Sequence, residues 1–197
     1  RPTCIYPSLQ ATKNGAILIS DWADWLGKGG SVEERPNIIL RTLLRPFETF
    51  YENHFKPYSS GITVICQKLF EKSRQLGIDN QKILYLPNGF NNPLLTSYDI
   101  KNARSSLNLS HKDFIIGYIG AGFRSDMDLM SASYQVLKEH IPNLKLIHIG
   151  RTKYHLEGMS DVIRTNEVDN KQMSLYLSAC NLFWLPFKNT NANAGRF

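Results

Sequence analysis

The sequence lacks several features that mark specialised classes of protein. Its 197 residues contain no apolar run that approaches the roughly 20 residues of a membrane-spanning helix. Its three cysteines, Cys4, Cys66 and Cys180, are odd in number and show no C-x-x-C spacing. We therefore expect neither a disulfide framework nor a cysteine metal site, but buried, reduced thiols in a cytoplasmic protein.

Histidine pairs and an excess of acidic residues are missing as well. The five histidines lack the i, i+4 pairing of a helical metal site, so we predict no bound metal. Basic residues outnumber acidic residues, 23 to 17, and the formal net charge is +6. The basic residues are spread along the chain, which argues against nucleic-acid binding. An ordinary solvated surface, affinity for phosphates, and peripheral contact with an anionic membrane surface remain open.

What the sequence does contain is a regular alternation of strand and helix patterns. Apolar or β-branched runs predict strands at residues 16–20, 61–66, 82–86, 113–119, 144–149, 161–164 and 181–186. Helical patterns end near residue 12 and span residues 37–57, 67–76, 97–107, 126–140 and 171–180. Pro46 is expected either to kink or to split the second helix. The alternation predicts an α/β fold with parallel sheets covered on both faces, and ligands at the carboxyl ends of the strands.

The helix expected at residues 126–140 has the clearest periodicity. Asp126 is a plausible N-cap for it. Apolar residues then follow at steps of three and four, at Met127, Met130, Tyr134, Leu137 and Ile141. This spacing predicts one buried helix face.

The strand expected at residues 113–119 runs into a glycine loop with an arginine, Gly117-x-x-Gly120-x-Gly122-x-Arg124. Glycine lets the backbone approach a ligand closely, and the following helix offers free N–H groups at its positive end. Arg124 adds a planar charged fork that suits a phosphate. The loop is therefore a candidate phosphate site. A tight strand-to-helix turn with a solvent-facing arginine is the alternative.

A nicotinamide-dinucleotide fingerprint fits the same loop poorly. The pattern G-x-G-x-x-G, started at Gly120, has Ser125 at its third glycine position. The strand that follows ends at Gly150-Arg151, without the acidic residue that would hold a ribose. A dinucleotide-dependent oxidoreductase is thus a disfavoured alternative.

The last residues, Asn193-Ala-Gly-Arg-Phe197, form a second candidate segment. They follow a predicted strand and an Asn-rich loop that leads to Gly195 and Arg196. An arginine at the start of a helix turn would stabilise a negatively charged group. An ordinary polar loop is the alternative.

The loop after the first predicted strand is a third candidate, because it combines carboxylates, tryptophans and glycines. Tryptophan faces stack on sugar rings, and carboxylates hold hydroxyl groups. Its candidate residues are Asp21, Trp22, Asp24, Trp25, Gly29 and Gly30. Both tryptophans could instead pack between helices. Hydrolysis of glycosides by the two aspartates is a remote alternative, since sequence spacing does not give their separation in space.

The segment Lys82-Ile-Leu-Tyr-Leu-Pro-Asn-Gly-Phe90 is the most informative one, because it joins the two halves of the chain. Its strand stops at Pro87-Asn88-Gly89, a strong turn signal, and the next strand leads into the glycine loop. In the order and spacing of these motifs, the chain resembles the nucleotide-sugar glycosyltransferases of the GT-B fold, in particular family 4. The C-terminal segment resembles the Asn-x-Gly-Arg-(Phe or Trp)-Pro pattern of one subgroup, although the chain stops before the proline.

This resemblance implies two Rossmann-like parallel-sheet domains, both incomplete in this chain. Residues 1–93 would be the C-terminal part of the acceptor domain, and residues 94–197 the N-terminal part of the nucleotide-sugar donor domain. We therefore expect the chain to be a piece of a longer protein, inactive or nearly so by itself.

The resemblance also implies the reaction and its residues. A sugar, expected to be a hexosyl group, would move from a nucleotide-diphosphate sugar to an acceptor hydroxyl, with retained configuration and without a metal. The catalytic candidates are Arg124, Arg196 and Asp24. The donor-binding candidates are Gly120, Gly122, Glu167, Val168, Asn193 and Gly195. The acceptor-binding candidates are Asp21, Trp22, Trp25, Gly29 and Gly30. Many family 4 members carry a histidine in this last loop, where the present chain has two Asp-Trp pairs.

The partners follow from that reaction. The nucleotide sugar would be a co-substrate, with no further cofactor. The acceptor would be a saccharide, a lipid-linked saccharide or a protein, as in polysaccharide biosynthesis. We expect a cytoplasmic protein, with peripheral membrane contact as an open possibility. The alternative from another class is a non-catalytic nucleotide-binding α/β module.

Overall fold

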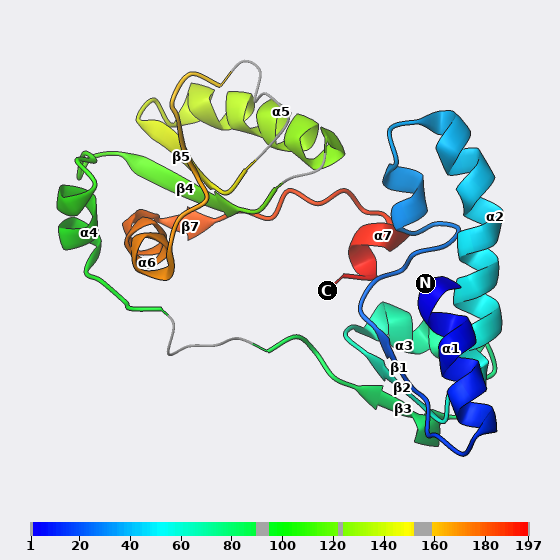
Figure 1. Cartoon of the computed structure of the whole chain (residues 1–197). Coiled ribbons are helices and arrows are strands. Elements are labelled where there is room, and N and C mark those ends of the chain that lie inside the picture. The colour runs from blue at the N-terminus through cyan, green and yellow to red at the C-terminus, as the bar shows by residue number, and fades with distance from the viewer. Residues whose placement is uncertain (1, 90–94, 122–123, 152–158, 197) are drawn as a thin grey trace. The chain divides into compact units, whose positions relative to one another are not determined.

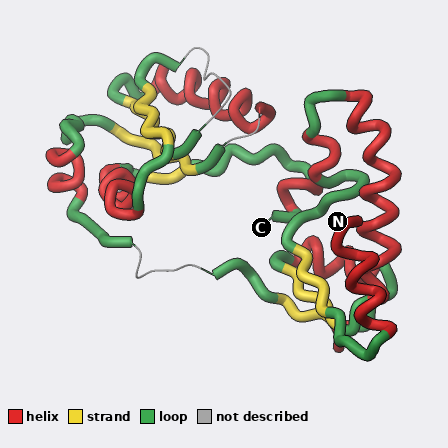
Figure 2. The backbone as a smooth tube through the Cα atoms, in the orientation of Figure 1, coloured by secondary structure: helices red, strands yellow, loops and turns green. Residues whose placement is uncertain are grey.

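The computed structural model describes residues 2–89, 95–121, 124–151 and 159–196, without the side chains of residues 2, 3, 124 and 125. Contacts between Cα atoms divide the chain into two compact units (Figures 1 and 2). Unit 1 comprises residues 1–89 and 189–197, and unit 2 comprises residues 90–188. The sequence predicted a boundary after residue 93. The last nine residues differ from that prediction, because they pack within unit 1.

Unit 1 is built on a three-stranded parallel sheet in the order β1-β2-β3. The strands are β1 (Ile19–Trp22), β2 (Gly61–Val64) and β3 (Ile83–Tyr85). Its core contains Trp22, Ile62, Val64, Cys66 and Leu69, with Trp25 packed against them. The β-branched residues of β2 alternate between buried and half-buried positions, as a strand within a sheet requires.

The helices of unit 1 frame this sheet. The α-helices are α1 (Pro2–Lys13), α2 (Ile38–Phe55), α3 (Gln67–Gln75) and α7 (Asn191–Ala194). Short 3₁₀ turns are η1 (Ser31–Glu34), η2 (Lys56–Tyr58) and η3 (Asn80–Lys82). Helix α1 lies beside α2 (Figure 1), where Tyr6 contacts the rings of Tyr51 and Phe55. Within the described residues, no helix is both long and apolar enough to cross a membrane.

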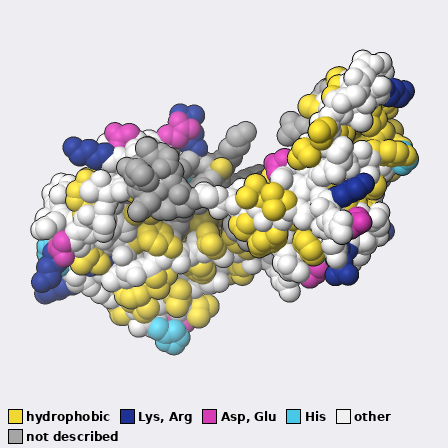
Figure 3. All heavy atoms as spheres, turned by 90° about the horizontal axis from the view of Figure 1, so that it is seen from below, with side chains coloured by type: hydrophobic (Ala, Val, Ile, Leu, Met, Phe, Trp, Pro, Cys, Tyr) yellow, Lys and Arg dark blue, Asp and Glu magenta, His cyan; other side chains and the backbone are white. Residues whose placement is uncertain are grey.

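Helix α2 is amphipathic with reversed polarity: polar side chains contact the rest of unit 1, and many apolar side chains are exposed. Its polar side chains bind other parts of unit 1: Thr49 accepts a hydrogen bond from Lys28 N at 2.8 Å, and Arg45 pairs with Glu33 at 2.8 Å. Its exposed apolar residues, 47–68% accessible, are Ile38, Ile39, Leu40, Leu43, Phe47 and Phe50. Hydrophobic side chains are visible on the surface in Figure 3. Polar contacts therefore hold this side of α2 against the rest of unit 1.

Unit 2 is built on a four-stranded parallel sheet in the order β6-β5-β4-β7. The strands are β4 (Phe114–Ile119), β5 (Leu144–Ile149), β6 (Val162–Asn166) and β7 (Leu182–Phe183). The helices are α4 (Ile100–Ser106), α5 (Arg124–His140) and α6 (Asn170–Ala179). Residues of α5 pack on one face of the sheet, and residues of α6 pack on the other. Both units are thus α/β with parallel strands, and the predicted fold class is confirmed.

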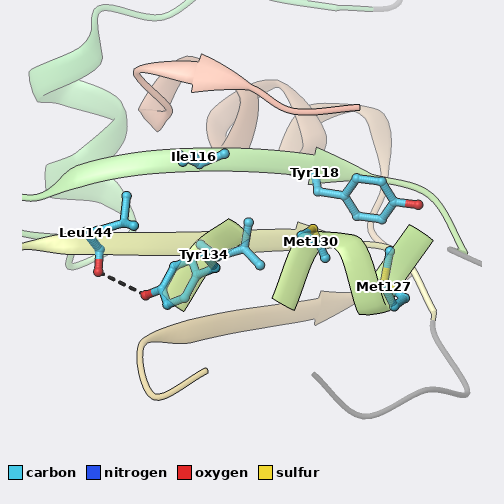
Figure 4. Packing of buried hydrophobic residues seen from close by; sticks show 7 residues of the cluster. Ile116, Tyr118, Met127, Met130, Tyr134 and Leu144 are labelled. Atoms are coloured by element: carbon cyan, nitrogen blue, oxygen red, sulfur yellow. Dashed lines mark hydrogen bonds between the residues drawn. The ribbon is translucent and has the colours of Figure 1, made fainter. Parts of the chain in front are cut away.

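The face of the sheet under α5 holds the larger core of unit 2. Met127, Met130 and Tyr134 of α5 pack on Ile116 of β4 and Leu144 of β5 (Figure 4). The Tyr134 hydroxyl donates a hydrogen bond to Leu144 O at 3.1 Å. Burial, followed by the charge of Asp161, raises the pKa of Tyr134 to about 12. The buried face predicted from the periodicity of this helix is therefore confirmed.

Three local predictions differ from the structure. The first strand begins at Ile19 rather than at residue 16, because the apolar residues before it lie in an exposed connection, where Ile17 is 79% accessible. Of the two outcomes expected at Pro46, the split does not occur, since α2 is one element from Ile38 to Phe55 with its cap at Asn37, and Pro46 lies inside it. Asp126 is not the N-cap of α5, because the helix already begins at Arg124.

No disulfide joins the described cysteines. Cys66 and Cys180 are buried, as expected, whereas Cys4 is exposed. Burial raises the pKa of the Cys180 thiol to about 12, which makes it an inert packing residue. On the face drawn in Figure 3, the Lys and Arg side chains that the structure describes lie in separate groups and form no single basic patch.

Candidate functional site

Arg196 is the centre of a polar cluster in unit 1. Its guanidinium donates to Asn193 Oδ1 at 2.9 Å, forms a short ion pair with Glu34, and lies 3.9 Å from Asp24. The Arg196 side chain is only 16% exposed. The structure therefore brings three predicted site residues, Arg196, Asn193 and Asp24, into one cluster. It also shows that the arginine charge is matched by carboxylates here.

The glycine segment of the loop after β1 packs against the tryptophan that precedes it. A Cβ atom at Gly30 would lie 2.1 Å from the Trp25 carbonyl oxygen, and one at Gly195 would lie 2.8 Å from Trp25 Cβ. Gly29 has φ +83°, in the region that favours glycine, and its position faces Asn191 of α7. Trp25, Gly29, Gly30 and Gly195, which the sequence predicted as site residues, thus meet where α7 contacts this loop.

Beneath the loop lies a buried carboxylate, Glu52 of α2, which is 4% exposed. It accepts hydrogen bonds from Trp22 Nε1 at 3.1 Å, Leu26 N at 2.7 Å and Gly27 N at 2.9 Å, and it pairs with the Lys72 ammonium. The two backbone donors, Leu26 N and Gly27 N, tie the loop after β1 to α2.

Two lysines border this carboxylate and the tryptophans. The ammonium of Lys72 lies 4.0 Å from the ring centroid of Trp25 and 5.2 Å from that of Trp22. Burial lowers the pKa of Lys72, and the contact with Glu52 opposes that shift. Burial also lowers the pKa of Lys56 to about 8, against the opposing charges of Glu52 and Asp21. Both ammonium groups are therefore partly removed from water.

The remaining loop candidates differ in their surroundings. Asp21 is exposed and accepts a short hydrogen bond from Thr63 Oγ1 on the neighbouring strand. Lys56 donates to the backbone oxygen of Asp21 at 3.0 Å. Trp22, by contrast, is 1% exposed in the core of unit 1. Its ring offers no open face to a sugar, so the stacking role predicted for Trp22 is corrected to a structural one.

In unit 2, the carboxyl ends of three neighbouring strands are tied together around Gly120. Gly120 N donates to Ile149 O at 3.0 Å, and Gly150 N donates to Asn166 O at 2.9 Å. A Cβ atom at Gly150 would lie 2.9 Å from Gly120 O. His148 Nε2 lies 2.8 Å from the same oxygen. The predicted phosphate loop therefore starts from a closely packed edge.

The other donor candidates lie at or near the same edge of the sheet. Glu167 follows β6 and pairs with Arg151 at 3.1 Å, and both side chains are at least 70% exposed. Val168 is half-buried and packs on the core beneath α6. Gly122 lies outside the described residues. The backbone of Arg124 opens α5, but its side chain is not described.

The two-unit α/β chain resembles solved glycosyltransferases. It superposes on sucrose-phosphate synthase from Thermosynechococcus elongatus with a TM-score of 0.62 and 17% identity, over 87% of this chain and 46% of that one. It superposes on HepE of Anabaena, solved with UDP, with a TM-score of 0.58 and 17% identity, over 91% of this chain and 49% of that one. A glycosyltransferase from Rickettsia africae gives a TM-score of 0.56 at 11% identity, over 84% of this chain and 44% of that one.

The fold is that of the GT-B glycosyltransferases. The chain spans about half the length of the GT-B structures that it matches. No protein-family model matches the chain, and no curated protein has a matching sequence. The GT-B fold predicted from the motifs is confirmed, whereas membership of family 4 remains a prediction.

The residues that hold the candidate loop after β1 and Arg196 were not predicted from the sequence. Glu34, Glu52 and Lys72 were not singled out, although each contacts a predicted site residue. One signal was present for Glu52: it shares a helix face with Arg45 and Thr49, at steps of three and four. Nothing in the sequence indicates that this polar face is the inward one.

Among the described residues, neither a group of metal ligands nor a pocket beside Tyr134 adds to the candidate site. No group of three His, Cys, Asp or Glu residues in the described parts of the chain could hold a metal ion. A pocket of about 250 Å³ lies beside Tyr134, Lys138 and Ser160. Tyr134 bonds to the first residue of β5, so this pocket lies at the opposite end of the sheet from Gly120. Parallel α/β sheets bind ligands at the carboxyl ends of their strands. We therefore assign this pocket no role.

Proposed function

We propose that this chain belongs to an enzyme that transfers a sugar from a nucleoside-diphosphate sugar to an acceptor hydroxyl. The observation that carries the proposal is the Gly120 loop. It leaves β4 at the carboxyl edge of a doubly covered parallel sheet and leads directly into the 17-residue helix α5. This is where α/β sheets bind phosphate groups. HepE of Anabaena, which shares the fold, has been solved with UDP and with UDP-glucose, so UDP is the first ligand to test.

The donor diphosphate would bind at this loop. Gly120 and Gly122 would let the backbone approach the phosphate oxygens, and Arg124 in the first turn of α5 would contribute its charged fork. Glu167 and Val168 follow β6 beside this edge, and we assign them to the nucleotide base. The site needs no further cofactor in this proposal.

Charge stabilisation would be the main catalytic effect. As the bond between the sugar and the diphosphate breaks, negative charge grows on the leaving group, and fixed cations stabilise that charge. Arg124 and Arg196 would supply these cations in place of a metal ion. Asn193 and Gly195 would shape the backbone at Arg196. We propose retention of configuration with this metal-free scheme.

The acceptor would meet the loop after β1. Asp21 and Asp24 are the exposed carboxylates there, and they would accept hydrogen bonds from sugar hydroxyls. Trp25 is half-buried, and Gly29 and Gly30 keep the loop close to it. We propose a hexosyl donor and a saccharide, lipid-linked or protein acceptor, as in polysaccharide biosynthesis. A cytoplasmic location with peripheral membrane contact suits such acceptors.

The first experiment is calorimetric binding of UDP to the chain without added metal. We expect binding that weakens by about tenfold or more in Arg124→Ala, since a hydrogen bond to a charged group contributes about 1.5–3 kcal/mol. Arg74→Ala, which removes an exposed arginine from α3, is the matched control and should leave binding unchanged. Equal affinity of Arg124→Ala and the unmodified chain would remove Arg124 from the donor site. Binding of NAD in place of UDP would favour the oxidoreductase.

One observation favours the non-catalytic nucleotide-binding module as a second candidate. Arg196 is paired with Glu34 and lies near Asp24, so its charge is already matched. If Arg196 binds the diphosphate, Glu34→Gln should raise the affinity for UDP, because the arginine loses a competing carboxylate. No change in Glu34→Gln or in Arg196→Ala would favour the module. Robust sugar transfer from UDP-glucose by the 197-residue chain alone would contradict our expectation that it is inactive.

A further inference from the structure

His148 is a buried polar residue that the proposed reaction does not use. It lies near the end of β5, and its side chain is fully buried. Its ring packs beside that of Tyr118, with centroids 5.2 Å apart. Nε2 lies 2.8 Å from Gly120 O, which is the first carbonyl after β4. A buried imidazole thus contacts the backbone at the start of the phosphate loop.

The partners of the two ring nitrogens define the direction of this hydrogen bond. A carbonyl oxygen can only accept, so Nε2 carries the proton and donates it to Gly120 O. Nδ1 is buried and has no hydrogen-bond partner among the described residues. An N–H group at that position would be a buried donor without an acceptor, which is costly. The ring is therefore held as the Nε2–H tautomer.

This hydrogen bond orients one peptide group. A trans peptide is planar, and its C=O and N–H bonds point in opposite directions. The described peptide bonds are all trans. Since the Gly120 carbonyl points at His148, the N–H of the next residue, Ala121, points away from it. Ala121 is an exposed residue at the start of the loop.

The orientation depends on a partner because glycine does not enforce it. Gly120 has φ +143°, and glycine accepts both orientations of the following peptide at little steric cost. Gly150 contributes as well, because a Cβ atom there would lie 2.9 Å from Gly120 O and disturb the contact. The His148 side chain supplies a hydrogen bond to this carbonyl in one of the two orientations.

We propose that His148 is a positioning residue for anion binding: its Nε2–H turns the Gly120–Ala121 peptide so that the Ala121 N–H faces the diphosphate. This inference rests on the proposed function, since it assumes that the loop binds the diphosphate of the donor. His148 itself would not touch the ligand. Its effect would therefore fall on the phosphate contribution to binding and not on the base or the ribose.

The test compares two variants whose new side chains have the same length, His148→Gln and His148→Met. Glutamine offers an N–H donor toward Gly120 O, whereas methionine fills similar space without a donor. We expect His148→Met to bind UDP about tenfold more weakly, the effect of one well-placed hydrogen bond, and His148→Gln to stay near the unmodified chain. Both variants should bind uridine as the unmodified chain does. Equal UDP affinity in all three proteins, or equal loss in both variants, would overturn the proposal.

A second measurement needs no substitution and holds even if a variant fails to fold. In the ¹⁵N-labelled chain, the Ala121 amide resonance should shift when UDP is added and stay in place when uridine is added. A UDP complex that leaves the Ala121 amide unmoved would overturn the role of this peptide. Absence of any UDP binding by the unmodified chain would instead refute the proposed function, so the two failures are distinguishable.

Discussion

Replacing Glu52 by glutamine should destabilise unit 1, and adding Lys72→Met should partly restore it. In the single variant Glu52→Gln, the amide oxygen can still accept from the backbone, but the Lys72 ammonium loses its counter-charge. Lys72 is only 7% exposed, so the lone ammonium cannot turn to water. Breaking a buried ion pair from one side costs about 3–5 kcal/mol.

Glu52→Gln, Lys72→Met and the double variant form a double-mutant cycle, and the same reasoning predicts the stability of the other two variants. Lys72→Met leaves Glu52 with its three N–H donors from Trp22, Leu26 and Gly27, so we expect a loss of only about 1–2 kcal/mol. The double variant contains no buried charge at this position. It should lose about 2 kcal/mol and should thus be more stable than Glu52→Gln alone, because a buried ion pair is replaceable by groups that fit.

Urea unfolding followed by tryptophan fluorescence measures this cycle. Trp22 and Trp25 lie in unit 1, so a Trp184→Phe background removes the signal of unit 2. Lys68→Met is the matched control, since Lys68 lies on the same helix, its side chain is 43% exposed, and its pair with Glu71 spans 4.0 Å. It should change stability by at most about 0.5 kcal/mol. A double variant less stable than Glu52→Gln would refute the argument.

Three further predictions follow from local geometry. Gly30→Ala should cost about 2 kcal/mol or more, because its Cβ would lie 2.1 Å from the Trp25 carbonyl oxygen; urea unfolding measures the loss. Tyr134→Phe should cost about 1 kcal/mol in the same assay, since it removes the 3.1 Å hydrogen bond to Leu144 O, which keeps a lysine donor. The contribution of Lys56 to the stability of the unmodified chain should increase from about pH 8 upward, because burial lowers the pKa of Lys56 from 10.5 to about 8. In this range the unfolded chain binds more protons than the folded chain. Lys56→Met should therefore show a smaller rise with pH.

Each of these predictions has a simple contradiction. Gly89→Ala is the control for the glycine, since a Cβ atom there meets nothing within 4 Å; equal losses at the two glycines would contradict steric packing. A Tyr134→Phe loss above about 3 kcal/mol would mean that Leu144 O is left without a partner. Parallel pH profiles of the unmodified chain and Lys56→Met, between pH 8 and 9.5, would show that this ammonium is not desolvated.

The fold of unit 2 was predictable because local and tertiary signals agree there. Met127, Met130 and Tyr134 recur at helical steps, and the helix that carries them buries that face. The apolar run in Phe114–Ile119 likewise became the strand β4, which has neighbours on both sides. Where the hydrophobic pattern of a segment matches its burial in the fold, the sequence alone is sufficient to predict the secondary structure and the buried face.

The supports of the site were not predictable, because they depend on contacts between distant segments. Arg196 pairs with Glu34, which is 162 residues away in the chain. Glu52 receives its hydrogen bonds from residues 25–30 positions earlier and an ion pair from a residue 20 positions later. No local pattern reports such partners. For the loop after β1, the burial of Trp22 emerged only from the sheet that encloses it.

The reversed polarity of α2 inverts the usual relation between residue type and tolerance to mutation. In most surface helices, variation accumulates at polar positions while apolar positions are restricted. On α2, the polar positions such as Thr49 and Glu52 hold the loop after β1 in place. The apolar positions, such as Leu43 and Phe47, face solvent within this unit. In a library of α2 variants selected for folding of this chain, the polar positions should therefore be conserved and the exposed apolar positions should vary freely.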